Sequence, residues 1–163
     1  MLWRIYTVLV LPHIQLALAK LVARLRGRRA FRVAGENMEP TLALGTIFTY
    51  VPMTPNHAVQ RGSIVAFTIP DFEGHAVPTR VVAVGGDRVR VEKGRLFVND
   101  DMVHEPYVKG GYDSSEYSIF LEEIPIPRNN YYVLGDNRDV SKDSRYFGPL
   151  PQSALLGARL APP

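Results

Sequence analysis

Cysteine is absent from this chain of 163 residues. Its absence excludes disulfides, a thiol nucleophile and a zinc site built from thiolates, and it leaves the compartment open, because oxidising and reducing spaces both tolerate such a protein. Internal repeats and low-complexity segments are absent as well. With 46% apolar and 21% charged residues, the chain has a globular composition, and its length suits one domain with a real core.

Acidic residues are missing from the start of the chain. Residues 1–35 hold seven basic side chains and no acid, whereas the remainder holds twelve basic and sixteen acidic ones. The seven are Arg4, Lys20, Arg24, Arg26, Arg28, Arg29 and Arg32. A basic leader on an acidic body predicts a membrane surface with anionic lipids as a partner. Nucleic acid is not an expected partner, because the body does not interleave basic and aromatic residues as single-strand binding needs.

The first part of this leader is almost free of charge. From Met1 to Ala19 only Arg4 is charged, and nineteen helical residues extend over about 28 Å, close to the hydrocarbon thickness of a bilayer. We therefore expect a transmembrane anchor helix. Pro12 does not oppose this interpretation, because membrane helices tolerate a kink.

Two alternatives for the leader stay open. The tripeptide "ALA" at 17–19 is similar to a signal-peptide cleavage site. In the other alternative the helix lies flat on the membrane, with an apolar face toward lipid. That face would consist of Leu16, Leu18, Leu21, Val22 and Leu25. The positive-inside rule adds a conflict over topology, since the basic cluster at 20–32 would leave the following domain on the cytoplasmic or matrix side.

Strand signals follow in quick succession after residue 33. Six stretches are rich in β-branched and aromatic residues and are bounded by Gly, Pro, Asn or Asp. They are residues 46–53, 63–70, 79–86, 87–94, 95–100 and 130–136. Their spacing predicts a mainly β fold, an antiparallel barrel or sandwich of coiled sheets. "RVRVEKGRLFVND" predicts a hairpin that turns at Glu92 to Gly94, and residues 109–118 predict an exposed loop or a small extra hairpin.

Two further stretches point to a site. "VAGENMEPTL" (33–42) has turn-forming residues arranged to present Asn37, although an asparagine amide is not a serviceable nucleophile. "GDNRDVSKDSRYFG" (135–148) alternates Asp, Arg and Ser directly after an apolar strand. A solvated loop of surface ion pairs is the plainer interpretation of the second stretch. The neighbouring Tyr146 and Phe147 favour a partly buried hydrogen-bonded network, of the kind that supports a reactive site.

Several of these stretches together resemble the type I signal peptidases, a family that includes bacterial enzymes and the mitochondrial inner membrane peptidases. "VAGENMEPTL" resembles the nucleophile box, and "RGSIVAF" the strand that follows it. "TRVVAVGGDRV" resembles the base box, "GRLFVND…EPY" a later hairpin, and "GDNRDVSKDSRYFGPLP…LLGARL" the closing box. The resemblance implies a membrane-anchored, mostly antiparallel β fold that cleaves export signals after small residues with a Ser nucleophile and a Lys base.

The resemblance assigns roles to individual positions. The nucleophile position, just before the Met-x-Pro-Thr that begins with Met38 and includes Pro40, holds Asn37. The base position holds Thr79, so both members of the dyad are substituted. By the same resemblance, Ser141 would hydrogen-bond the base, while Asp143 and Arg145 would form an ion pair that holds the closing box. The N–H of residue 37 would belong to an oxyanion hole, which an acid at Glu36 would oppose.

Three functions are compatible with these residues. The favoured hypothesis is a catalytically inactive signal peptidase homologue that binds a peptide or acts as a scaffolding or partner subunit. The first alternative is an active signal peptidase, a serine endopeptidase with a displaced dyad. The second is a relative of the self-cleaving repressor domains, which is weakened because no helix-turn-helix module precedes the body.

The resemblance also sets the expected organisation of the chain. Residues 1–32 would form the anchor helix and basic segment, and residues 33–163 the signal-peptidase-like β domain. No cofactor and no metal are expected. The partners would be a membrane and either preprotein signal peptides, an active sister peptidase or a larger membrane complex. The location would be the bacterial inner membrane, with the β domain on its outer face, or the mitochondrial inner membrane.

Overall fold

The structure, a computed structural model, describes residues 2–54, 58–108 and 120–159. Eleven strands lie in this part of the chain. They are β1 (Arg29–Arg32), β2 (Ile47–Pro52), β3 (Ile64–Phe67), β4 (Val77–Val84), β5 (Arg88–Glu92), β6 (Arg95–Val98), β7 (Asp101–Met102), β8 (Phe120–Pro125), β9 (Asn130–Leu134), β10 (Leu150–Pro151) and β11 (Leu155–Ala158). The helical elements are α1 (Leu2–Leu25), α3 (Ser144–Phe147) and the short 3-10 turns η1 (Pro70–Phe72) and η2 (Gln152–Ala154).

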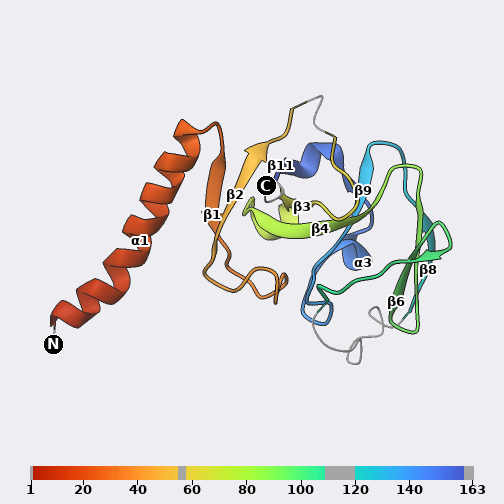
Figure 1. Cartoon of the computed structure of the whole chain (residues 1–163), viewed down its shortest axis with the longest axis horizontal. Coiled ribbons are helices and arrows are strands. Elements are labelled where there is room, and N and C mark those ends of the chain that lie inside the picture. Colours follow the sequence, from red (N-terminus) through yellow and green to blue (C-terminus); the bar gives the residue numbers. More distant parts are fainter. Residues whose placement is uncertain (1, 55–57, 109–119, 160–163) are drawn as a thin grey trace.

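The strands form two antiparallel sheets. The larger has seven strands in the order β1-β2-β11-β3-β4-β9-β10, and the smaller has four in the order β7-β6-β5-β8. Figure 1 shows the smaller sheet beside the larger one, on the side away from α1. The larger sheet begins at β1 and ends at β10, so it is coiled without closing into a barrel. The expected mainly β, antiparallel fold is confirmed.

Each of the six stretches expected to form strands overlaps one, although β4 begins two residues earlier than expected, and the hairpin is where it was predicted. Glu92 pairs with Arg95, and the two residues between them, Lys93 and Gly94, have φ of 49° and 73°. Both lie in the left-handed region that a two-residue hairpin turn requires. Strands β1, β7, β8, β10 and β11 were not anticipated. The predicted loop at 109–118 lies outside the described residues.

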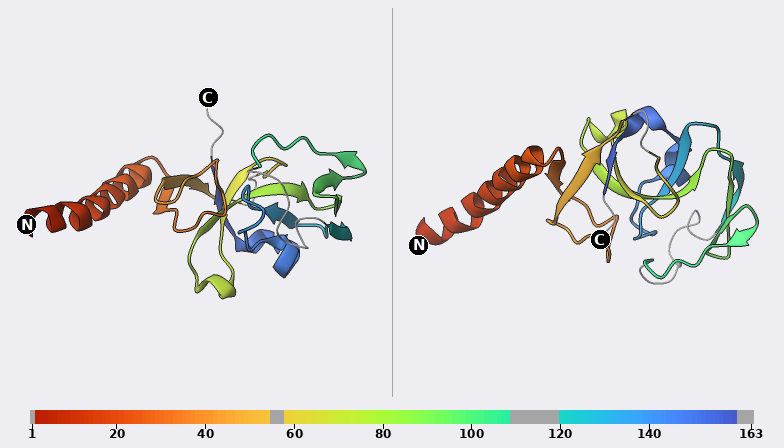
Figure 2. Two further views of the ribbon diagram at one scale, coloured as in Figure 1. Left: turned by 90° about the horizontal axis from the view of Figure 1, so that it is seen from below. Right: turned by 45° about the horizontal axis from the view of Figure 1, so that its top comes forward.

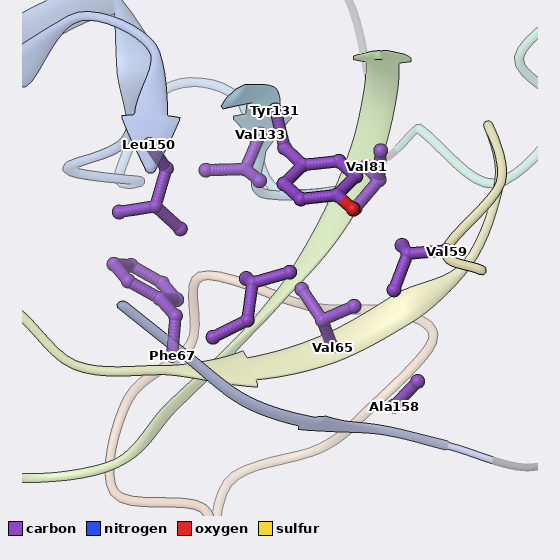
Figure 3. Packing of buried hydrophobic residues seen from close by; sticks show 9 residues of the cluster. Val59, Val65, Phe67, Val81, Tyr131, Val133, Leu150 and Ala158 are labelled. Carbon is purple, nitrogen blue, oxygen red and sulfur yellow. The ribbon is translucent and has the colours of Figure 1, made fainter. Parts of the chain in front are cut away.

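The larger sheet separates two apolar cores, because adjacent strand residues point to opposite faces. On β9, Tyr131 and Val133 join one core, while Tyr132 and Leu134 join the other. Figure 3 shows the first core, in which labelled side chains of β3, β4, β9 and β10 point toward one another. Burial on both faces explains why β9 reads as an almost continuous apolar run.

A third, smaller core lies at the β1 and β2 end of the larger sheet. It contains Val33, Met38, Leu42, Phe48 and Ala66. Three of these residues come from the segment that leads into β2, so this core attaches residues 33–42 to the sheet. The attachment matters for the site, because Asn37 lies within that segment.

The leader is one helix, α1, which continues past Pro12 to Leu25. Its C-terminal half lies beside β1, with Ala23 buried there, while its N-terminal end extends away from the sheets (Figures 1 and 2). Within the described residues, no helix has the length and apolarity needed to span a membrane, so the expected transmembrane helix is not supported. In the flat alternative, Leu16 was placed toward lipid, but it is half-buried.

Candidate active site

The segment from Val33 to Gly45 is a closed loop. The N–H of Val33 donates to Thr46 and its carbonyl accepts from the N–H of Gly45, each at 2.8 Å. Inside the loop, Met38 is fully buried, and its carbonyl accepts the N–H of Leu42 at 2.8 Å. Pro40 lies exposed in the turn between them. Because the buried methionine fixes its neighbour, Asn37 has a defined position at the rim of the loop.

Asn37 is bound to two other parts of the chain. Its side-chain Nδ2 donates to the carbonyl of Pro78 on β4 at 2.7 Å. Its backbone carbonyl accepts the N–H of Asn137 at 3.0 Å, and the side chain of Asn137 donates to the carbonyl of Glu36 at 3.1 Å. The structure therefore brings together the three motifs that the sequence places far apart.

Thr79 follows Pro78 on β4 and is almost completely buried, at 1% exposure. It pairs with Val65 on β3, and its hydroxyl has no hydrogen-bond partner in the part of the chain that the structure describes. A buried hydroxyl without a partner costs roughly 1–3 kcal/mol. Ser141 thus does not hydrogen-bond the residue at the expected base position.

Gly135 explains how closely the closing box approaches Asn37. A Cβ atom at this position would overlap both the side chain of Ser141 and the carbonyl oxygen of Asn37. Only glycine fits between them. Ser141 is itself buried, at 4% exposure, so its hydroxyl lies beside the backbone of Asn37 and away from bulk water.

Asp143 and Arg145 form a buried ion pair with two hydrogen bonds, Nε to Oδ1 at 2.8 Å and Nη2 to Oδ2 at 2.9 Å. Both side chains are 1% exposed. Asp143 also accepts the N–H of Gly135 at 3.0 Å, and Arg145 donates to the carbonyl of Arg138 at 2.6 Å. The pair therefore holds the closing box together through its backbone as well as through charge.

A second buried pair was not anticipated from the sequence. Arg80, next to Thr79, donates to Asp136 through Nε at 2.8 Å and Nη2 at 2.7 Å. The hydroxyl of Thr41 donates to the same carboxylate. Asp136 is fully buried, so one carboxylate joins β4, the closing box and the loop that carries Asn37. Burial acts to lower the pKa of Arg80, but the hydrogen bonds and charge of Asp136 outweigh it, and the pKa is raised.

The outer side of this pair is covered by the segment after β7. The ring of Tyr107 lies over the guanidinium of Arg80, 3.7 Å from ring centroid to Cζ, and its hydroxyl donates to Glu105 at 3.0 Å. Glu105 in turn forms a buried ion pair with Arg138. Burial first, and then the charge of Glu105, raise the pKa of Tyr107. A covered arginine–carboxylate pair of this kind is a structural element with little access to solvent.

An open groove of about 370 Å³ runs beside Asn37. Its walls come from the loop and from the closing box. They are Ala34, Gly35, Glu36, Asn37, Leu44 and Val140. Leu44 and Val140 are 55% and 57% exposed, so the groove has two apolar side chains at its rims, together with the polar Glu36 and Asn37 in its lining.

Two ionisable groups that could serve as a base, His75 and Lys142, have partners elsewhere. The ring Nδ1 of His75 lies 3.0 Å from the carbonyl of Phe72, and Lys142 pairs with Asp71 at 3.1 Å. Within the described residues, neither is hydrogen-bonded to Asn37 or Thr79. There is also no group of three or more His, Asp or Glu arranged to bind a metal in the part of the chain that the structure covers.

The chain was compared with known families and proteins. It matches the family model "Signal peptidase, peptidase S26" over residues 4–162. Signal peptidase IB of Staphylococcus aureus (strain COL) is 30% identical over 143 residues, which covers 78% of this chain and 73% of the relative. Signal peptidase I V of Bacillus subtilis (strain 168) is 29% identical over 137 residues, with 78% and 80% covered.

A solved structure shares the fold. Signal peptidase I from Enterococcus faecalis V583 superposes with a TM-score of 0.56 and 28% identity, covering 64% of this chain and 98% of that chain. The fold, the motif order and the family model agree. This chain belongs to the signal peptidase family, peptidase S26.

Proposed function

We propose that this chain is a catalytically silent member of the family that holds an extended peptide or a partner subunit in the groove beside Asn37. One observation carries the proposal. The side chain at the nucleophile position is an amide bound to the Pro78 carbonyl, and the next residue of that strand, at the base position, is a buried threonine. The proposal rests on the alignment of these two positions with the family dyad.

The chemistry of the two side chains supports this proposal. A serine hydroxyl attacks a carbonyl only when a base takes its proton, and a lysine serves as that base when burial lowers its pKa. The nitrogen of Asn37 is delocalised into its amide, and the Thr79 hydroxyl is not a base near neutral pH. Glu36 adds a negative charge at the rim, which opposes a developing oxyanion.

The geometry around β4 supports a binding role. From Val77 to Thr79 this strand pairs with β3 on one side, whereas its pairing with β9 begins only at Arg80. The other edge of Val77–Thr79 is therefore not paired with β9. Apart from the hydrogen bond between Asn37 and the Pro78 carbonyl, this edge is where an extended peptide could add as a strand. The exposed Leu44 and Val140 would then contact its side chains. A preprotein signal peptide, an active sister peptidase or a larger membrane complex would supply that segment.

The alternative is an active signal peptidase with a displaced dyad. Two observations favour it: the relatives are named signal peptidases, and the buried Ser141 places a hydroxyl beside Asn37. Activity of that kind would need a base close to Ser141. A cleavage assay that includes a Ser141 variant therefore distinguishes the two functions.

The test is cleavage of a preprotein by the unaltered protein and by Asn37→Ser/Thr79→Lys. We expect no turnover by the unaltered protein or by either single replacement. The double replacement should show activity on the order of 10³-fold above background, because nucleophile and base act as a unit. Its activity should rise with pH, since a buried lysine must lose its proton to act as base. Turnover by the unaltered protein that Ser141→Ala abolishes would establish the displaced dyad instead.

Binding is measured separately, by fluorescence anisotropy of a labelled signal peptide. Leu44→Asp/Val140→Asp should weaken binding by about tenfold or more, because both apolar rims are lost. Met102→Asp, which changes a side chain that is 57% exposed on the smaller sheet, is the matched control. Equal binding by both variants would contradict a groove at Asn37.

We also propose a membrane location, in the bacterial inner membrane with the β domain on its outer face or in the mitochondrial inner membrane. The basic leader supports this proposal, because seven basic residues without an acid suit an anionic lipid surface. The membrane location would be contradicted if the protein were recovered in the soluble fraction of a lysate whose membranes are kept intact.

A further inference from the structure

The first three residues of β4 have one edge that no strand pairs with. Further along β4, Val81 directs its backbone toward the β3 side, since its N–H donates to the carbonyl of Ser63 at 2.9 Å. Alternate residues of an antiparallel strand direct their backbone groups to opposite edges. Val77 and Thr79 therefore face β3, as Val81 does, and Pro78 faces the edge where the pairing with β9 has not yet begun.

Pro78 determines which hydrogen bonds this edge can form. Proline has no N–H, so between Val77 and Thr79 the edge presents no backbone donor, and the carbonyl of Pro78 is the one backbone acceptor that it presents. Edge strands use proline in this way to discourage the addition of another strand. An extended peptide that pairs with this part of β4 would thus depend on a single carbonyl.

The side chain of Asn37 already occupies that carbonyl. Its Nδ2 donates to the Pro78 oxygen at 2.7 Å, and because a carbonyl only accepts, the amide must present its nitrogen there. Asn37 is half-buried and lines the groove, whereas Pro78 is buried and does not line it. The amide of Asn37 therefore lies between the groove and the acceptor.

Only the side chain of Asn37 has room to move. Its backbone carbonyl accepts the N–H of Asn137 at 3.0 Å, and the next residue, Met38, is fully buried. Beside the amide, by contrast, Gly35 carries no side chain, and even an added Cβ would lie 3.5 Å from the Asn37 Oδ1. A change of rotamer at one residue would therefore uncover the Pro78 carbonyl without rearrangement of the loop.

From these observations we propose that Asn37 is an autoinhibitory latch, whose amide takes the place of a peptide N–H. An extended peptide pairs with β4 only after this amide has rotated away. The inference rests on the proposed function, because it concerns the peptide that the groove would hold. The peptide gains a hydrogen bond to Pro78 as the bond from Asn37 is lost, so the latch should weaken binding by about two- to tenfold, the typical net contribution of one hydrogen bond.

The first experiment compares peptide binding by the unaltered protein, Asn37→Ala and the nearly isosteric Asn37→Asp. The probe is the labelled signal peptide, measured by fluorescence anisotropy at neutral pH. We expect the Kd to fall by about two- to tenfold in both variants, because neither side chain can donate to the Pro78 carbonyl. The matched control is Asn130→Ala, which removes an amide that donates to the carbonyl of Arg128 at 3.0 Å outside the groove lining, and it should leave the Kd unchanged.

The second experiment observes the hydrogen bond itself by NMR. In the free protein, we expect a scalar coupling through the hydrogen bond between the Nδ2 of Asn37 and the carbonyl carbon of Pro78. Saturation with an isotope-labelled signal peptide should remove this coupling and replace it with a coupling from a backbone nitrogen of the peptide. A coupling from Asn37 that persists in the complex would overturn the latch, because the peptide would then bind without displacing the amide.

The binding results distinguish a failure of the latch from a failure of the groove. Tighter binding by both Asn37 variants, or binding by these variants alone, supports the latch. Equal or weaker binding by both variants would overturn the latch and leave the groove as a peptide site. If neither the unaltered protein nor the variants bound the peptide, the groove would be rejected as a peptide site, and the latch with it.

Discussion

Thr79 and Asp136 lie within one site, yet the polar atoms of their side chains differ in the number of hydrogen bonds that they form. Asp136 is fully buried and accepts three hydrogen bonds, two from Arg80 and one from Thr41. The hydroxyl of Thr79 is equally buried and has no partner among the described residues. A buried carboxylate must be paired, since stranding it costs several kcal/mol, whereas an orphan hydroxyl costs far less.

This difference distinguishes the residues that hold the site together from the residues at the two positions where the family resemblance expects chemistry. The pairs around Asp136 and Asp143 connect the loop, β4 and the closing box, so the fold itself depends on them. The side chains at 37 and 79 can change without such a loss. The scaffold of the site can therefore stay stable whichever side chains stand at 37 and 79. This comparison can be tested by removing members of each class.

The largest loss of stability is expected from Arg80→Ala. It leaves the buried carboxylate of Asp136 with one neutral donor, and breaking a buried pair in this way costs about 3–5 kcal/mol. Urea unfolding measures the change. The control is Arg88→Ala, whose partners Asp100 and Glu123 are exposed and whose removal should cost less than about 1 kcal/mol. Similar losses of stability in both variants would show that the pair of Arg80 with Asp136 contributes no more than an exposed pair.

A smaller effect is expected from Gly135→Ala. The added methyl group would overlap Ser141 and the carbonyl of Asn37, and overpacking of this kind costs about 1–3 kcal/mol. Gly35→Ala is the matched control, since its Cβ would meet only the Asn37 side chain at 3.5 Å. The midpoint of thermal unfolding compares the two, and a neutral Gly135→Ala would show that the closing box is free to move away from Asn37.

The two threonines give the most direct comparison. Thr41→Val removes a donor to a buried carboxylate and should destabilise the protein by about 1.5–3 kcal/mol. Thr79→Val removes a hydroxyl that has no partner, so we expect a change near zero or a gain of about 1 kcal/mol. Urea unfolding of both variants under one condition measures the two changes in the free energy of unfolding. If Thr79→Val proved the more costly change, its hydroxyl would be satisfied in solution.

The smallest effect is expected at Asp87, a hydrogen-bonded carboxylate far from the groove. Burial acts to raise its pKa, but hydrogen bonds from Arg61, Val84 and Asn99 outweigh it, so the pKa is lowered from 3.8. A lowered pKa in the folded state contributes stability above the unfolded pKa, and this contribution is lost as the pH falls through the folded value. Unfolding midpoints between neutral pH and acid should therefore fall less steeply in Asp87→Asn, and identical slopes would contradict the shift.

Local signals account for the parts of the fold that were predicted. The hairpin at Lys93 and Gly94 was found because alternating valines flank residues suited to a tight turn. Strands β10 and β11 have only two and four residues, and they exist because they pair with β9, β2 and β3 across the chain. Such pairings leave no periodic pattern in the short segments themselves.

The candidate site was also predicted only in part. Asn37, Ser141, Asp143 and Arg145 stand within recognisable motifs, so the family resemblance located them. The link through Asp136 was missed, although its partners Arg80 and Thr41 stand beside Thr79 and Pro40 in the same motifs. The hydrogen bond from Thr41 joins residues 95 positions apart, and nothing local indicates which carboxylate a threonine will meet.

By itself, the sequence determined the family, the strand-rich body and the basic leader, because composition and motif order are properties of the chain. Only the tertiary structure decided that Asn37 bonds to Pro78 and that Asp136 joins three segments. These features depend on contacts between distant residues, and such contacts form only when packing of the cores brings those segments together.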